Sequence, residues 1–235
     1  MIIIVNKNIP EHAFKQLGKY GKVLPLETNE ITYPAISGHP DVFFCSSGKY
    51  LIIAPNTPVD FKRALTDNQV SYVEGLREVG NEYPETAVYN AVITEHFLIH
   101  NLQITDNKIK ELCADKTAIH VNQAYTKCNL LPLKNDSFIT SDKGIYKTLI
   151  ANRLNVLYVN PQGIILPEFK HGFFGGTCGV YKNQVFILGS LSKFPDGRKV
   201  EAFLTDANYQ IVELYDGSLF DGGSLLFTVT INSPF

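Results

Sequence analysis

The hydrophobic pattern of the chain repeats a unit made of one short apolar run, one amphipathic helical pattern and a second apolar run. The first runs are rich in β-branched and aromatic residues and predict strands at 1–6, 49–55, 96–101, 137–142 and 184–190. Apolar residues spaced by three and four positions after a Pro, Asp or Thr predict helices at 10–20, 59–68, 105–115, 142–153 and 196–207. Second strands are predicted at 22–27, 70–75, 118–123, 156–161 and 210–215.

A further strand is predicted before four of these five units, at 41–45, 87–93, 127–133 and 177–181. The first unit lacks one, and the C-terminal run at 222–231 supplies it. We therefore predict an α/β fold of five ββαβ repeats, a five-bladed α/β-propeller in which 224–231 pairs with 2–5 and removes two exposed sheet edges. The alternative is an open α/β sheet with accidental spacing. The repeat covers 1–235, so a single domain is expected.

Composition narrows the class of protein. The chain has 235 residues, 45% of them hydrophobic, and a formal net charge of −2, so no basic surface points to nucleic acid as a partner. The longest apolar runs, such as 1–5 and 51–55, are far shorter than the roughly 20 residues of a membrane helix. The N-terminus does not read as a signal peptide, and four dispersed cysteines are typical of reduced thiols. A cytoplasmic protein is expected.

Five closed ββαβ units resemble the pentein fold of guanidine-group modifying enzymes, and the segments YTKC, ITSDKGI, HGFFGGTCGV, KFPDG and DGGSLLF look like an uncharacterised bacterial branch of it. The resemblance implies arginine deiminase-like chemistry or the fold's non-enzymatic, ribosome-binding branch. Its enzymes carry a nucleophilic Cys on the last strand, after a Gly-Gly-Asn-x-His motif. Here GGSLLF places Leu226 and Phe227 at the His and Cys positions, so that triad cannot be transferred.

The ends of five inner strands converge in such a ring and form a central pocket, the default ligand site. The polar residues predicted to enter those strands are the candidate ligand-binding set: His39, Asp41, Asn90, Lys127, Thr177 and Ser224. A polar or charged side chain that is buried without a partner is energetically costly, so positions that served only the core would be expected to be apolar. Asp41 is expected to hold a cationic group, and His39 either orients it or belongs to a turn.

Two cysteines are candidate nucleophiles. Lys127 next to Cys128 would lower the thiol pKa, unless the two side chains point to opposite faces of a strand. Cys178 lies among glycines that let backbone approach a ligand, or is a small buried hydrophobe. Cys45 and Cys113 are interpreted as packing residues.

His171 is the candidate acid or base, because it lies in a long segment, 162–176, that we expect to cover the pocket mouth. An exposed loop histidine and a surface excursion are the alternatives. The six histidines show no metal-ligand spacing, and HGFFGGTCG lacks the phosphate-loop ending, so no metal or cofactor is predicted.

Two functions follow. One is a thiol-dependent hydrolase or transferase acting on a guanidine- or amidine-like small molecule. The other is a non-catalytic propeller that binds a ligand or partner. The sequence indicates a small-molecule ligand, leaves the oligomeric state open, and predicts neither a nucleic-acid nor a membrane partner.

Overall fold

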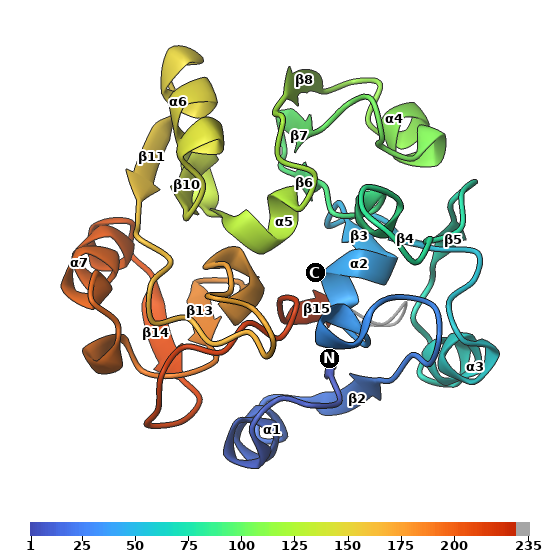
Figure 1. Ribbon diagram of the computed structural model, residues 1–235, viewed down its shortest axis with the longest axis horizontal. Helices are drawn as coiled ribbons and strands as arrows, with labels where there is room; N and C mark the ends of the chain where they lie inside the picture. The colour runs from blue at the N-terminus through green and yellow to red at the C-terminus, as the bar shows by residue number, and fades with distance from the viewer. Residues whose placement is uncertain (229–235) are drawn as a thin grey trace.

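The five predicted strand–helix–strand units are present in the computed structural model, which describes residues 1–228. Within them, five three-stranded sheets occur. Figure 1 shows the units following one another around a common centre, each with its longer helix on the outside. The mixed α/β class predicted from the sequence is confirmed. No helix in this part of the chain is both long and apolar enough to cross a bilayer.

Each sheet has the same internal order. Its middle strand pairs antiparallel with one neighbour and parallel with the other. The sheets are β15 (Leu226–Thr228), β1 (Ile2–Asn6), β2 (Lys22–Leu26); β3 (Phe44–Ser46), β4 (Leu51–Ile53), β5 (Val73–Glu74); β6 (Val92–Ile93), β7 (Phe97–His100), β8 (Thr117–His120); β9 (Leu130–Pro132), β10 (Ser137–Thr140), β11 (Asn155–Tyr158); and β12 (Cys178–Tyr181), β13 (Gln184–Ile187), β14 (Gln210–Glu213).

The C-terminal strand completes the first unit. β15 pairs antiparallel with β1 in the register Ile2 with Thr228, Ile3 with Phe227 and Ile4 with Leu226. The predicted pairing is therefore confirmed for Leu226–Thr228. It is wrong for Ser224 and Leu225, whose amides donate to the Gly176 and Cys178 carbonyls of another unit instead, and 229–231 lie outside the described residues. Chain ends that share one sheet leave no free edge on β1.

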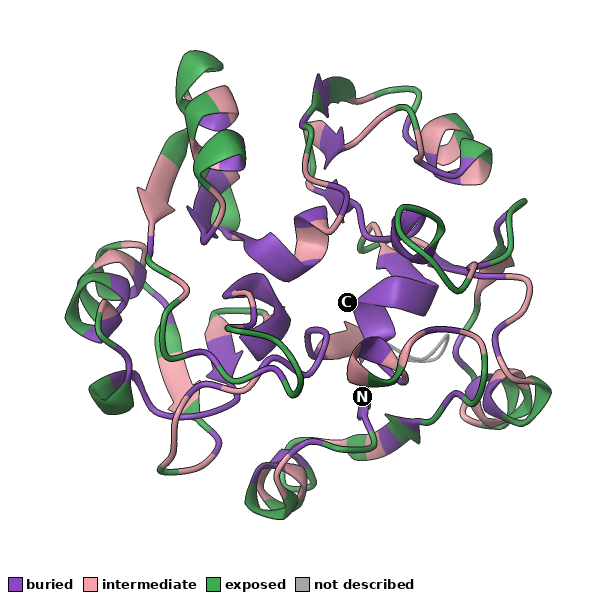
Figure 2. Ribbon diagram, in the orientation of Figure 1, coloured by how far each residue is buried: buried purple, intermediate pink, exposed green. Residues whose placement is uncertain are grey.

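The parallel crossovers are the five predicted amphipathic helices: α1 (Glu11–Leu17), α3 (Val59–Asp67), α4 (Asn107–Leu112), α6 (Lys143–Ala151) and α7 (Gly197–Asp206). The N-cap residue Asp142 shows why α6 begins where it does. Its Oδ1 accepts a hydrogen bond from the Ile145 amide at 2.7 Å, which satisfies one of the free amides of the first helical turn. Residues spaced by four, such as Phe61 and Leu65 of α3, are buried. The outer faces are exposed (Figure 2).

The inner segments differ from the prediction. Where strands were expected to begin, the chain first makes a short helix or turn: α2 (Pro40–Phe43), η2 (Glu85–Ala87), α5 (Thr126–Asn129) and η4 (Gly175–Thr177). Two further 3-10 turns, η3 (Lys134–Asp136) and η5 (Leu191–Lys193), precede β10 and α7, and η1 (Pro34–Ile36) precedes α2. Pro40 at the first helical position explains α2, because its fixed φ suits a helix start.

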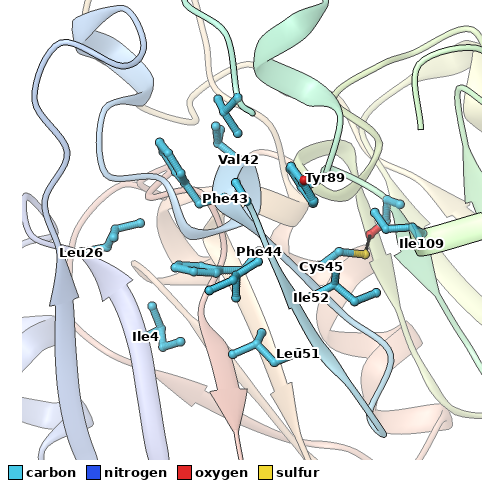
Figure 3. Close-up of a cluster of buried hydrophobic side chains, with 14 of the residues drawn as sticks. Ile4, Leu26, Val42, Phe43, Phe44, Cys45, Leu51, Ile52, Tyr89 and Ile109 are labelled. Carbon is cyan, nitrogen blue, oxygen red and sulfur yellow. Dashed lines mark hydrogen bonds between the residues drawn. The ribbon is translucent and has the colours of Figure 1, made fainter. Parts of the chain in front are cut away.

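The apolar core is divided among the units. The largest cluster fills the space between the first three and includes Ile4, Phe43, Phe44 and Tyr89 (Figure 3). Cys45 belongs to it and donates its S–H to the Ala91 carbonyl at 3.6 Å. Burial raises the pKa of this thiol, consistent with the packing role predicted for it.

Candidate functional site

Inner segments from neighbouring units are hydrogen-bonded to one another at the centre. The Asp41 amide donates to the Gly223 carbonyl at 3.0 Å, the Lys127 amide to the Asn90 carbonyl at 2.9 Å, and the Ser224 amide to the Gly176 carbonyl at 2.8 Å. Most residues of these inner segments are buried (Figure 2). The central polar residues are therefore held by backbone contacts between units.

Asp41 is the centre of this cluster, which we call the axial cluster: Asp41, Asn90, Cys128, Asp221 and Ser224. One carboxylate oxygen, Oδ2, accepts from Ser224 Oγ at 2.8 Å and from Cys128 Sγ at 3.1 Å. The other, Oδ1, is buried without a hydrogen-bond partner within residues 1–228. A buried carboxylate oxygen normally has a partner, so Oδ1 is the natural point for a ligand to attach.

Asn90 fixes the geometry between Asp41 and Cys128. Its Nδ2 lies 2.8 Å from the Asp41 carbonyl oxygen and 3.2 Å from Cys128 Sγ, and its Oδ1 accepts the Cys128 amide at 3.1 Å. The side chain is fully buried. It therefore orients the thiol toward the carboxylate.

The Cys128 thiol is not activated as the sequence suggested. Lys127 and Cys128 lie in α5 and not in a strand. Burial, followed by the nearby charges of Asp41 and Asp221, raises the thiol pKa well above its usual value. The hydrogen bond to Asp41 also favours the protonated thiol. Burial and the two carboxylates therefore outweigh the attraction of Lys127, and the net lowering of the thiol pKa that the sequence suggested does not occur.

Asp221 is the functional candidate that the sequence analysis missed. Its Oδ2 accepts the Phe173 amide at 2.8 Å and its Oδ1 accepts the Gly223 amide at 3.1 Å. Burial and then the charge of Asp41 raise its pKa to about 7. Gly176 is required beside it, since a Cβ there would collide with the Asp221 carboxylate. The sequence signal that could have identified Asp221 is the Asp-Gly-Gly-Ser run at 221–224, from which the sequence analysis selected only Ser224 as a candidate.

Ser224 reaches Asp41 through an unusual backbone conformation. Its φ is +71° and that of Gly223 is +73°, a left-handed region that serine seldom occupies. The resulting sharp turn directs Oγ to Asp41 and to the Gly175 carbonyl, 3.1 Å away. Non-glycine residues in this conformation are concentrated at functional sites.

Thr177 and Cys178 bond within their own segment. Thr177 Oγ1 donates to the Phe174 carbonyl at 2.8 Å and lies 3.2 Å from Cys178 Sγ. Burial raises the Cys178 pKa to about 12. Within residues 1–228, neither side chain is hydrogen-bonded to Asp41, so the structure does not join these two residues to the axial cluster by hydrogen bonds.

His39 is buried beside the axial cluster and packs on Gly223. Its Nδ1 has no hydrogen-bond partner in the described part of the chain. Burial lowers its pKa to about 4, against the attraction of Asp41. The ring is therefore neutral at physiological pH and is available to a ligand as a dipole, not as a charge.

His171 is half-buried and its Nδ1 lies 3.0 Å from the carbonyl of Gly172. The segment 162–176, which contains His171, contacts another unit, because the centroid of the Phe169 ring lies 6.1 Å from that of the Tyr33 ring. The Tyr33 hydroxyl in turn lies 2.9 Å from the Tyr125 hydroxyl. None of the hydrogen bonds made by His171 joins it to the axial cluster. An acid–base role for this residue remains a prediction.

A small cavity of about 50 Å³ adjoins the axial cluster, lined by Asp41, Lys127 and Ser224 together with apolar residues that include Phe44 and Leu226. A larger surface groove of about 630 Å³ lies between β2 and α3 and does not touch the cluster. Within residues 1–228, no group of three His, Cys, Asp or Glu side chains is placed to hold a metal ion.

Leu226 and Phe227, the positions that the resemblance sets against the enzymes' His and Cys, are apolar and take part in packing. Leu226 lines the cavity. The Phe227 ring lies 4.8 Å from that of Phe186 and 5.7 Å from that of Tyr181.

Comparisons with known proteins agree with this fold. Solved structures similar to the chain include an agmatine deiminase from C. jejuni, at 12% identity and TM-score 0.55, with 91% of this chain and 74% of that one covered. DDAH from Pseudomonas aeruginosa, complexed with citrulline, has 9% identity and TM-score 0.53, with 90% and 91% covered. An amidinotransferase from Microseira wollei has 12% identity and TM-score 0.54, with 90% and 87% covered.

No curated protein matches the chain. One family model does, over residues 4–226, and its description is "Family of unknown function (DUF6873)". That range spans all five units. The chain therefore belongs to the DUF6873 family, and its fold is that of the pentein superfamily.

Proposed function

We propose that this protein is a five-bladed pentein propeller that binds a small guanidinium or amidinium compound at the axial cluster. The observation that carries the proposal is the buried, unpartnered Oδ1 of Asp41 in a site that also holds the Asp221 carboxyl. A buried carboxylate oxygen without a hydrogen-bond donor is costly. A planar cation with parallel N–H donors satisfies it in the way that arginine satisfies carboxylates in proteins.

The second carboxyl group tunes the site for a cation. Asp221 has a pKa of about 7 because of burial and Asp41, so part of the population carries a proton there at neutral pH. A bound cation stabilises the ionised form, and ligand binding is expected to release a proton. The structural relatives include an agmatine deiminase and an amidinotransferase, names that indicate the same class of ligand.

Thermal stabilisation by agmatine tests the proposal. Ligand at about 100 times its Kd stabilises a protein by about 2.7 kcal/mol, which raises the Tm of a chain of this size by roughly 5–10 °C. We expect this shift with agmatine and a much smaller one with 1,4-diaminobutane, which lacks the planar head group. Asp41→Asn should abolish the shift, whereas Asp216→Asn, at an exposed site, should retain it. Equal shifts with both compounds would contradict the proposal.

A second candidate function is thiol-dependent hydrolysis or group transfer by Cys128, with the proton movements assigned to His171. One contact favours it: Cys128 Sγ donates to Asp41 Oδ2 at 3.1 Å. A cation next to the sulfur lowers the thiol pKa, so ligand binding itself would raise the thiolate fraction. The thiolate would then attack the central carbon of the guanidinium or amidinium group, so that a C–S bond forms, a C–N bond breaks and the amine leaves with a proton. Water in hydrolysis, or an acceptor amine in group transfer, would then attack the same carbon, break the C–S bond and return the thiol with a proton.

Paired alkylating reagents separate the two functions. We expect neutral 2-chloroacetamide to label Cys128 more slowly than it labels free cysteine, because the thiol is buried and its pKa is raised. If Cys128 is catalytic, cationic 2-chloroacetamidine should label it at least about tenfold faster than the neutral reagent does, relative to free cysteine. Asp41→Asn should remove that preference. The absence of any preference would leave only the binding function.

The cellular setting is also part of the proposal. All four cysteines are buried free thiols, although Cys128 and Cys178 both lie at the centre of the fold. Free thiols in this number are typical of a reducing compartment. We therefore place the protein and its small-molecule ligand in the cytoplasm.

A further inference from the structure

Two long connections between units carry exposed aromatic rings. Tyr83, in the connection at 76–86, is 58% exposed, and Phe169, in the connection at 162–176, is 52% exposed. Each ring contacts a half-buried tyrosine: the ring centroids of Tyr83 and Tyr125 lie 5.8 Å apart, and those of Phe169 and Tyr33 lie 6.1 Å apart. Exposed apolar side chains that gather in one place are typical of a binding surface. We call these four side chains the aromatic cover.

The aromatic cover lies across the centre of the ring of units. Tyr33 precedes the inner segment of the second unit, Tyr125 that of the fourth and Phe169 that of the fifth. The Tyr33 hydroxyl nevertheless lies 2.9 Å from the Tyr125 hydroxyl, and its ring contacts that of Phe169. The second unit has the first and the third as its neighbours around the common centre (Figure 1). Contacts with the fourth and fifth units therefore have to cross the centre.

The aromatic cover is next to the axial cluster. Tyr125 is the N-cap residue of α5, and Cys128 lies in the first turn of that helix. Phe169 comes three residues before Gly172, and Gly172 is so close to Asp221 that a Cβ built on it would lie 2.5 Å from the Asp221 side chain. In both segments the cover residue precedes the one at the axial cluster. The cover therefore lies at the end of the ring from which the inner segments enter.

The other end of the ring leaves little room beside Asp41. There the inner segments continue as strands, and the small cavity is lined by Phe44 of β3, Val92 of β6 and Pro132 of β9 together with Asp41. Its volume of about 50 Å³ accommodates only a few water molecules. A ligand whose cationic head group is bound by Asp41 therefore has any larger substituent on the side of the aromatic cover.

We propose that the aromatic cover selects guanidinium or amidinium compounds that carry an uncharged aromatic or alkyl substituent, which packs against Phe169 and Tyr83. This inference rests on the binding of the head group by Asp41 proposed above. The cover consists of rings and phenolic hydroxyls. Burial raises the pKa of the Tyr33 and Tyr125 hydroxyls, so both are neutral at physiological pH. The four side chains thus provide apolar surface and ring edges, and no charge to pair with a charged far end of the ligand.

Isothermal titration calorimetry of the full chain with three guanidinium compounds tests this inference. In 2-phenylethylguanidine a ring is attached through two carbons, methylguanidine has no substituent that reaches the cover, and agmatine has a charged far end. We expect the Kd of 2-phenylethylguanidine at pH 7 to be at least about tenfold lower than that of methylguanidine, because each buried CH₂ group improves affinity about fourfold. 2-Phenylethylguanidine should also bind more tightly than agmatine.

Two variants and a matched control locate the contact. Phe169→Ala removes an exposed ring, so the fold should be retained, and the Kd of 2-phenylethylguanidine should rise at least about fivefold while that of methylguanidine stays the same. Tyr83→Ala should act in the same direction. Ile150→Ala is the control, because Ile150 is 46% exposed on the outer helix α6, and it should leave all three Kd values unchanged.

Three results would overturn the inference, and they separate it from the proposed function. Equal Kd values for 2-phenylethylguanidine and methylguanidine would overturn the inference but leave the binding of the head group in place. A preference for 2-phenylethylguanidine that survives both Phe169→Ala and Tyr83→Ala would show that the substituent packs elsewhere. Absence of binding by all three compounds would overturn the proposed function, and the inference with it.

Discussion

A chain that ends at Leu225 is expected to aggregate instead of folding cooperatively. The truncation removes β15, whose residues pair with Ile2, Ile3 and Ile4. All five residues of β1 are buried, and the unpaired edge of such an apolar strand is a template for association with another chain. The loss of pairing and packing is comparable to the whole stability of a domain, about 5–15 kcal/mol.

The matched control is a chain that ends at Thr228. It retains β15 and every pair between β15 and β1, and we expect it to elute in size-exclusion chromatography in the same oligomeric state as the full chain and to unfold in a single thermal transition. Aggregation of both truncations would attribute the effect to residues beyond Thr228. A soluble 1–225 chain with a cooperative transition would show that closure by β15 is dispensable.

The repeat could be predicted because it rests on local signals. Helix periodicity, Pro and Asp at helix starts, and short β-branched runs are all written in neighbouring residues. α3 and α7 lie where these signals placed them. The pairing of β15 with β1, although distant in sequence, followed from counting strands in each repeat.

The inner segments were harder to predict because their conformation depends on neighbouring units. The run at 41–45 is apolar and was predicted as a strand, yet Asp41 and Phe43 belong to the short helix α2. The Asp41 amide bonds to the Gly223 carbonyl, 182 positions away along the printed sequence. No local pattern contains such a contact, and a four-residue helix has too few residues to show a period.

Electrostatic roles were the least predictable part of the site. Adjacent in sequence, Lys127 and Cys128 suggested an activated thiol. In the fold the sulfur instead donates to Asp41 Oδ2 at 3.1 Å, and Lys127 is one of the residues that line the small cavity. Asp221 escaped notice because nothing in its sequence neighbourhood indicates that a second carboxylate, Asp41, lies near it. The pKa values of Cys128 and Asp221 are both determined by burial and by the charge of Asp41, which is far away in the sequence but close in the fold.

Asp221 should give the protein an unusual pH dependence. Its pKa is about 7 in the folded chain, from a reference value of 3.8. An acid whose pKa is raised by folding is held more tightly in its protonated form, so its contribution to stability is lost as the pH rises from about 4 to about 7. The full loss is about 4 kcal/mol at 1.36 kcal/mol per pKa unit.

Two buried histidines act in the opposite direction. His39 and His100 have pKa values lowered from 6.5 to about 4 by burial. Groups of this kind contribute stability that is lost as the pH falls below about 6.5, because the unfolded chain takes up the protons first. When the pH falls from 8 to 6, the contribution of the two histidines to the free energy of unfolding decreases by roughly 1.6 kcal/mol, whereas the contribution of Asp221 increases by about 1.4 kcal/mol.

We therefore expect the free energy of unfolding of the natural sequence to change little between pH 8 and pH 6. The substitution Asp221→Asn removes the stabilising contribution of Asp221 at low pH but keeps the destabilising contributions of His39 and His100. The free energy of unfolding of this variant should therefore fall by roughly 1.6 kcal/mol from pH 8 to pH 6. Urea unfolding of both proteins at each pH measures the difference, which is independent of any uniform effect of the substitution. Asp216→Asn, at an exposed carboxyl, should follow the natural sequence. Parallel curves for Asp221→Asn and the natural sequence would show that the Asp221 carboxyl is already ionised below pH 6, and its proposed proton release on ligand binding would then be ruled out.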